Sequence, residues 1–163
     1  RRELTEVGTE VDVDGVLGPA APAEPGVRVR GRIDRLERDA EGRLVIVDVK
    51  TGKSPVSKDD AQNHAQLAAY QLAVSEGLLE QGAEPGGGKL VYIGKAAASG
   101  ATEREQDPMN PQSRDGWRAQ VHHTAAATAG PQFTARVNDG CAHCPVRPGC
   151  PAHRADGTGE QPR

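Results

Sequence analysis

The fold of this chain is decided by two stretches, Gly31-Arg32-Ile33-Asp34-Arg35 and Val47-Asp48-Val49-Lys50-Thr51-Gly52. Polar and apolar residues alternate from Val27 to Glu37, and Leu44 to Val49 is an almost continuous apolar run. Both patterns are typical of β-strands, and the segment between them, Asp39-Ala40-Glu41-Gly42, has the composition of a hairpin turn. The sequence therefore predicts that the two stretches form one hairpin.

The predicted register of this hairpin places two acids opposite each other. With a three-residue loop of Ala40-Glu41-Gly42, whose glycine takes the left-handed conformation, Asp34 faces Asp48. Alternate side chains of a strand share one face, so Lys50 lies on the same face as Asp48. Opposed like charges destabilise a strand pair, and a divalent cation between them would remove that cost. The alternative is a solvated hairpin with ordinary surface acids, but the apolar neighbours of Asp48 favour the metal site.

The remainder of the chain predicts a mixed α/β domain, with a short strand before a loose loop over residues 15–26. Ser57-Lys58-Asp59-Asp60 has the composition of a helix start. The further expected elements are a helix over 59–81, a strand over 89–94, irregular structure over 95–112 and a helix over 113–129.

In this order, the hairpin motifs followed by Gln66-Leu67-Ala68-Ala69-Tyr70 resemble the RecB-type PD-(D/E)XK nucleases, over about residues 27–153. The cysteine tail brings the likeness closer to the AddB and AdnAB-like, UvrD-related helicase–nucleases. The resemblance implies a restriction-endonuclease-like core, a mixed sheet flanked by helices. It further implies that Asp34, Asp48 and the Val49 carbonyl bind Mg²⁺ or Mn²⁺, and that Lys50 assists the attacking water.

Gln66 and Tyr70 are four residues apart, so they lie on one face of the predicted helix. The resemblance identifies them as a Q-x-x-x-Y motif that lines the active site and contacts DNA. The competing interpretation has Tyr70 packed in the core and Gln66 solvated.

All three cysteines lie in the tail, as Cys141-x2-Cys144-x5-Cys150. Three thiols so close together suit a metal-binding loop better than a disulfide, and zinc could take His143 or His153 as its fourth ligand. The resemblance implies a 4Fe–4S cluster instead, whose fourth cysteine lies upstream of the nuclease core and outside this chain.

The chain starts at Arg1 and its only methionine is Met109, so we expect it to be an N-terminally truncated piece of a longer protein. The resemblance places a further metal ligand upstream, and we therefore expect the fragment alone to cleave DNA poorly or not at all. The expected domains are a partial nuclease core (1–137), the cysteine segment (138–153) and a disordered tail (154–163).

The net charge of −3 excludes a polycationic coat protein but allows a local basic surface. Four aromatic residues provide no platform for base stacking, so DNA contacts should be directed to the backbone. A cluster of basic residues could form a lip beside the metal site that attracts phosphates, and ordinary solvated strand faces explain it equally well. These residues are Arg28, Arg30, Arg32, Arg35 and Arg38, followed by Lys50, Lys53 and Lys58.

Together these features predict a metal-dependent DNA nuclease module, expected to be an exonuclease in double-strand-break repair. By resemblance it is cytoplasmic, is joined to an upstream ATP-binding helicase and works with a partner helicase–nuclease subunit. No apolar run approaches the roughly 18 residues of a membrane span. The alternatives are a stand-alone CRISPR-adaptation-type exonuclease and an inactive scaffold that binds DNA or a partner subunit.

Overall fold

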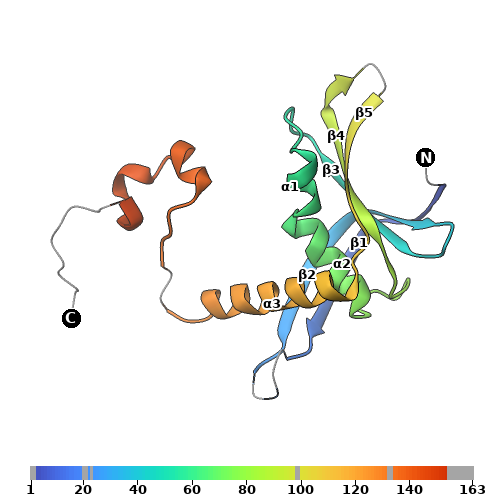
Figure 1. The fold of residues 1–163 in the computed structure, drawn as a ribbon, viewed down its shortest axis with the longest axis horizontal. Coiled ribbons are helices and arrows are strands. Elements are labelled where there is room, and N and C mark those ends of the chain that lie inside the picture. The colour runs from blue at the N-terminus through green and yellow to red at the C-terminus, as the bar shows by residue number, and fades with distance from the viewer. Residues whose placement is uncertain (1–2, 20–21, 23, 98–99, 132–133, 154–163) are drawn as a thin grey trace. The chain divides into compact units, whose positions relative to one another are not determined.

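The computed structural model of the chain describes residues 3–19, 22, 24–97, 100–131 and 134–153 (Figure 1). It contains a five-stranded sheet in the order β1-β2-β3-β4-β5. The strands are β1 (Leu4–Leu17), β2 (Val27–Asp39), β3 (Leu44–Lys50), β4 (Pro85–Ala97) and β5 (Gly100–Gln106). The helices are α1 (Lys58–Gln62), α2 (Ala65–Ser75) and α3 (Pro111–Thr128), followed by 3-10 turns η1 (Asp139–His143), η2 (Arg147–Gly149) and η3 (Pro151–His153).

The sheet is mixed: β3 and β4 are parallel, and the other neighbouring strands pair antiparallel. Parallel strands need a long crossover connection, and here α1 and α2 supply it between β3 and β4. The predicted mixed α/β fold, a sheet with packed helices, is confirmed. None of the described helices is long and apolar enough to cross a membrane.

The hairpin of β2 and β3 has the predicted register. Arg35 pairs with Val47, and the Asp39 amide donates to the Arg43 carbonyl at 3.0 Å. Gly42 takes the left-handed conformation with φ of 85°. The pairing ends at Arg35 and Val47, so Asp34 and Asp48 are the next residue on each strand beyond the paired segment.

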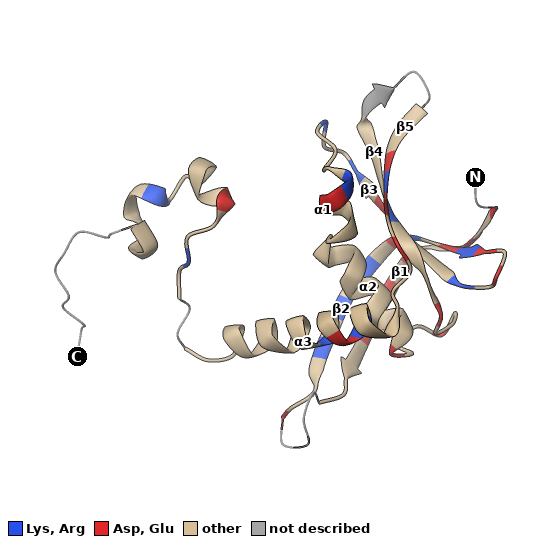
Figure 2. Ribbon diagram, viewed as in Figure 1, with Lys and Arg blue, Asp and Glu red and all other residues tan. Residues whose placement is uncertain are grey.

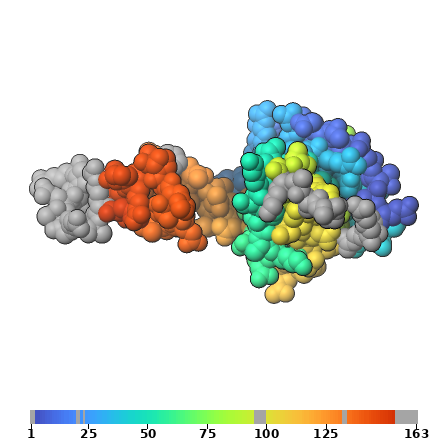
Figure 3. Space-filling model, turned by 90° about the horizontal axis from the view of Figure 1, so that it is seen from above, coloured from blue at the N-terminus to red at the C-terminus, as the bar shows by residue number. Residues whose placement is uncertain are grey.

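The core lies between the sheet and α2. Leu67 and Val74 of α2 are fully buried in the same cluster as Ile33 and Ile46 of the hairpin and Leu90 of β4. In the space-filling view, the residues of α1, β4 and β5 (teal to yellow) lie side by side (Figure 3). The packing of α2 on the sheet therefore holds in place β2 and β3, the strands that carry the predicted acids.

The single helix predicted over 59–81 is wrong, because the chain turns at Asn63 between α1 and α2. The predicted start is correct, since the Ser57 hydroxyl accepts from the Asp60 amide at 3.0 Å. At the turn, the Asn63 side chain donates to the Asp59 carbonyl and thereby ends α1. The second helix ends at Ser75, where Gly77 follows with φ of 69°, a left-handed residue that suits a helix end.

Three strand limits also differ from the predictions. Residues 15–17 belong to β1 and not to a loop, since they pair with β2. Residues 85–88 belong to β4, although their glycines predicted a loop. Residues 100–106, predicted as irregular, form β5, an edge strand whose polar sequence carries no apolar alternation.

The chain divides into two compact units, Arg1–Ala125 and Ala126–Arg163. The first unit contains the sheet, α1, α2 and most of α3; the second contains the cysteine segment. The predicted boundary after residue 137 stays a prediction. The predicted tail over 154–163 lies outside the described residues.

Candidate active site

The two predicted acids are joined through the backbone of β3. Asp34 Oδ2 accepts a hydrogen bond of 2.7 Å from the Val49 amide, so the side chain on β2 reaches across to the strand that carries Asp48. Asp48 is only 4% exposed, whereas the Val49 side chain lies at the surface. The hairpin therefore brings one partly buried and one buried carboxylate to the end of β3.

Lys50 connects Asp48 to the start of α2. Its Nζ lies 2.8 Å from Asp48 Oδ2 and donates to Gln66 Oε1 at 2.9 Å. Apart from the ion pair with Lys50, Asp48 Oδ2 is buried without a hydrogen-bond partner among the described residues. The Lys50 ammonium thus compensates the buried charge of Asp48, and the carboxylate retains capacity for a further ligand.

Tyr70 contacts the protein backbone at the site. Its hydroxyl donates to the Arg32 carbonyl at 2.8 Å, two residues before Asp34. The ring lies over Gly31, where a Cβ atom would come within 3.0 Å of the hydroxyl. The structure thus brings Gln66 to Lys50. Tyr70 packs its ring on Gly31 and binds the Arg32 carbonyl, so it both packs against β2 and positions that strand.

His64 also belongs to the surroundings of the site, although its spacing in the sequence did not point to it. Its pKa is lowered by burial and by the nearby charge of Lys50, while Asp48 acts in the opposite direction. Its Nδ1 atom is buried without a hydrogen-bond partner among the described residues. The one sequence signal that could have drawn attention to it is its place two residues before Gln66.

The donor set suits a hard divalent cation. Mg²⁺ binds proteins through one or two carboxylates and fills its remaining positions with water and phosphate oxygens. Asp34 and Asp48 supply two carboxylates, and Lys50 is the one partner of the buried Asp48 Oδ2 among the described residues. Within the described ranges no group of three His, Cys, Asp or Glu side chains could hold a metal ion.

Comparison with known proteins agrees with this geometry. Residues 1–151 match the PD-(D/E)XK nuclease superfamily. The chain belongs to this superfamily. No curated protein matches it. The solved structure described as "Crystal structure of SSO0001" is similar with 21% identity and a TM-score of 0.48, covering 90% of this chain and 61% of that one. The chain thus spans about three-fifths of that protein.

Basic residues recur along β2 in this superfamily member (Figure 2), and its arginines are largely paired with acids. Arg28 makes two hydrogen bonds to Asp14, and Arg32 lies 3.2 Å from Glu10. These pairs are exposed, and the pKa of Asp14 is lowered by its hydrogen bonds to Arg28. The basic surface that the sequence suggested therefore has much of its charge balanced by neighbouring acids.

The three cysteines lie on consecutive tight turns of the second unit. The Cys144 amide donates to the Cys141 carbonyl, and the Cys150 amide donates to the Arg147 carbonyl. All three thiols are free and half-buried. In the part of the chain that the structure describes, they do not gather with a histidine into a metal-binding group.

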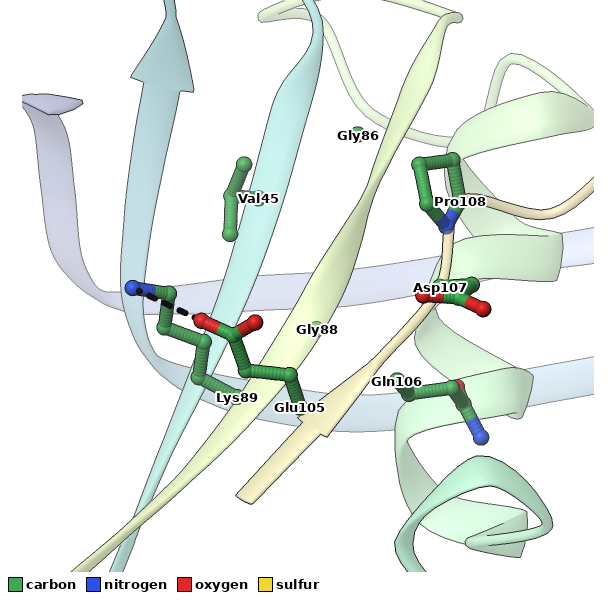
Figure 4. Close-up of a pocket in the computed structure, with 8 residues that line it drawn as sticks. All are labelled: Val45, Gly86, Gly88, Lys89, Glu105, Gln106, Asp107 and Pro108. Carbon is green, nitrogen blue, oxygen red and sulfur yellow. Dashed lines mark ion pairs between the residues drawn. The ribbon is translucent and has the colours of Figure 1, made fainter. Parts of the chain in front are cut away.

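A hollow of about 290 Å³ lies near the opposite end of β3 from Lys50 (Figure 4). Lys89 forms an ion pair with Glu105 beside it, at 3.5 Å. None of the predicted site residues of the nuclease lines this hollow. It is lined by Val45, Gly86, Gly88, Lys89, Glu105, Gln106, Asp107 and Pro108.

Proposed function

We propose that the chain is a metal-dependent deoxyribonuclease module that hydrolyses phosphodiester bonds, and that it acts as an exonuclease. The observation that carries this proposal is Asp48: its buried oxygen is unsatisfied except for Lys50, in a member of a nuclease superfamily. Asp34 and Asp48 would hold Mg²⁺ or Mn²⁺, with the Val49 carbonyl as a further ligand. A bound cation would activate water and polarise the scissile phosphate.

Lys50 is held ready for a second role. Its side chain is 31% exposed, and Asp48 and Gln66 fix its ammonium group from two sides. A positive charge held in this manner can orient water and stabilise charge that develops on a phosphate. Because the contacts already exist in the free chain, little reorganisation is needed when DNA binds.

DNA would approach from the side of Gln66, which is exposed at the first turn of α2. Lys50 binds the amide oxygen of Gln66, so the amide NH₂ group can donate to the DNA backbone. Tyr70 would act mainly through β2, since its hydroxyl is already bonded to the Arg32 carbonyl. Backbone contacts of this kind carry little sequence preference.

The wider context is also a proposal. The RecB-type resemblance supports a cytoplasmic helicase–nuclease that repairs double-strand breaks, in which ATP acts only through the helicase part and a second helicase–nuclease subunit is the partner. A stand-alone exonuclease of the CRISPR-adaptation type would share the site. The size of the whole protein and a test for DNA-stimulated ATP hydrolysis separate the two.

An iron–sulfur cluster is a separate proposal, supported by the C-x2-C-x5-C spacing alone. It requires the turns around Cys144 to draw the thiols together and a fourth thiolate from elsewhere. Protein purified without oxygen should contain iron and show charge-transfer absorbance. About one bound zinc per chain without that absorbance would instead indicate a Cys₃His site.

The nuclease proposal is tested by thermal unfolding with and without Mn²⁺. Mn²⁺ should raise the Tm of the parent chain, because a ligand that binds only the folded state stabilises it, and should not raise that of Asp48→Asn. Labelled linear DNA is incubated with both proteins in parallel. Cleavage that depends on Mn²⁺ and is lost in Asp48→Asn supports the activity and overturns the expectation that the fragment alone is inactive.

The absence of a Tm shift in the parent would refute the metal site. A normal Tm shift and DNA binding, with no cleavage by the whole protein, would favour the inactive scaffold. Asp59→Asn is the matched control: it removes an exposed acid from the first turn of α1 and should leave the response to Mn²⁺ unchanged.

A further inference from the structure

A buried glutamine at the end of β5 binds the corner between α1 and α2. Gln106 is 6% exposed, and its Nε2 lies within hydrogen-bond distance of three backbone carbonyls. These belong to Ala61 at 3.3 Å, Gln62 at 3.0 Å and His64 at 3.2 Å. Only the donor side of the amide suits three acceptors, so the orientation of the group is determined by its partners.

A second glutamine fixes the first. Gln71 of α2 is 1% exposed, and its Nε2 donates to Gln106 Oε1 at 2.9 Å and to the Asp107 carbonyl at 3.1 Å. Its Oε1 accepts from the Met109 amide at 2.9 Å. Every polar atom of the two amides therefore has a partner, and a fully satisfied buried network of this kind is rigid.

The network ends where the candidate site begins. The His64 carbonyl that accepts from Gln106 also accepts the first hydrogen bond of α2, from Ala68 at 3.0 Å. Gln66 lies between these residues, on the first turn, and receives the hydrogen bond of Lys50. The direction of this turn, and hence the place of the Gln66 amide, depends on the anchored corner.

We infer that Gln106, oriented by Gln71, is a positioning residue that holds the α1–α2 corner so that Gln66 meets Lys50. This inference rests on the proposed nuclease function, since it assigns a support to that site. It explains why a polar side chain is buried at the end of an edge strand. An apolar residue there would remove a hydrogen bond from the Gln62 carbonyl and one of the two partners of the Ala61 and His64 carbonyls.

The test is the side-chain amide signal of Gln66 in the ¹⁵N spectrum of the whole chain, assigned by its loss in Gln66→Ala. In Gln106→Leu this signal should move and broaden, because the contact with Lys50 is loosened. Gln106→Asn is the milder second variant; it retains an amide that is too short to reach all three carbonyls. Asp39→Asn is the matched control. It changes a buried polar side chain at the end of β2, beside the start of β3 and away from Lys50.

A second measurement uses DNA affinity in Ca²⁺, by fluorescence anisotropy. Gln66→Ala should weaken binding about fivefold in the parent, the value of one hydrogen bond. In the Gln106→Leu background the same change should cost less than about twofold, since residues that act through one another are not additive. In the Asp39→Asn background the full effect of Gln66→Ala should remain.

A folded Gln106→Leu chain with an unchanged Gln66 signal and an undiminished effect of Gln66→Ala would overturn the inference. Loss of the fold in both Gln106 variants would overturn it as well, because it would assign Gln106 to overall stability. If the parent does not bind DNA, the proposed function fails, whereas the spectrum still decides whether Gln106 positions Gln66.

Discussion

The Val49 amide donates a hydrogen bond of 2.7 Å to Asp34 Oδ2, so one acid of the site is fixed by the strand that bears the other. Asparagine can still accept this bond through its carbonyl oxygen but brings no charge. We therefore expect Asp34→Asn to leave the free energy of unfolding within about 0.5 kcal/mol of the parent. Its affinity for Mn²⁺ should fall at least about tenfold. Even a residue that only hydrogen-bonds to a metal ligand changes metal affinity by about that factor when it is replaced.

Asp34→Ala is the comparison for this prediction. It loses the hydrogen bond as well as the charge, so unfolding in urea should show an additional loss of about 1 kcal/mol. Isothermal titration with Mn²⁺ measures the affinity of both variants. An Asp34→Asn chain that binds Mn²⁺ as tightly as the parent would remove Asp34 from the site.

Tyr70→Phe should affect the site through β2. The variant loses the hydrogen bond to the Arg32 carbonyl, which should cost about 1 kcal/mol of stability. Tyr92→Phe is the control, because the Tyr92 hydroxyl accepts one hydrogen bond from the Val56 amide at 3.2 Å. Both variants should be destabilised in urea, but only Tyr70→Phe should weaken Mn²⁺ binding; equal Mn²⁺ affinities would contradict a positioning role for Tyr70.

The hairpin could be predicted in detail because its two strands and its turn carry independent, local signals. The alternation before Asp39, the apolar run after Arg43 and the glycine of the turn all specify the same register. With that register, Asp34, Asp48 and Lys50 are brought together by the period of a strand alone. The spacing of Gln66 and Tyr70 on one helix face was also within reach of the sequence.

The remainder depends on contacts between segments that are distant in the chain. The corner at Asn63 is held partly by Gln106, more than 40 residues away in the chain. The apolar periodicity of residues 59–81 therefore does not predict the break between α1 and α2. The edge strand β5 has no apolar face to detect, because its polar side chains before Gln106 are exposed or half-buried. His64 acquires its buried Nδ1 atom from tertiary packing, so its sequence neighbours give no sign of it.

Gly94→Ala should disturb the strand end that carries Lys50. A Cβ atom at this position would clash with the Thr51 carbonyl oxygen, so the backbone after Lys50 must move. Overpacking of this kind costs about 1–3 kcal/mol, and the displaced Lys50 should also weaken DNA binding. Gly116→Ala in α3 is the control: nothing lies within 4 Å, and a helical alanine should add about 0.5–1 kcal/mol. A Gly94→Ala chain as stable as the parent would contradict the close approach.

Asp39 should make the chain more stable at neutral than at acid pH. Burial alone would raise its pKa, but hydrogen bonds from the side chain and backbone of Arg43 outweigh it and hold the pKa below 3.8. A lowered carboxyl pKa stabilises the fold above pH 3.8, and this contribution is lost as the pH falls through the folded-state pKa. Asp39→Asn should therefore cost about 2 kcal/mol at neutral pH. Urea unfolding should show the difference from the parent shrinking as the pH falls below 3.8, and a constant difference would contradict the charge effect.

Glu10 should store strain in β1 beside the candidate site. It has a φ of 51°, and its neighbours Thr9 and Val11 pair with Arg35 and Ile33, so it lies alongside the segment that contains Asp34. The left-handed conformation costs about 1–2 kcal/mol for a residue with a Cβ atom, and glycine escapes that cost. Glycine also loses about 0.5–1 kcal/mol through the greater freedom of the unfolded chain, so Glu10→Gly should be neutral or slightly stabilising. Thr9 has no positive φ, so Thr9→Gly relieves no strain and should lose the full amount of about 0.5–1 kcal/mol, the cost of the added freedom of the unfolded chain. Equal losses in urea unfolding for the two variants would show that no strain is stored at Glu10.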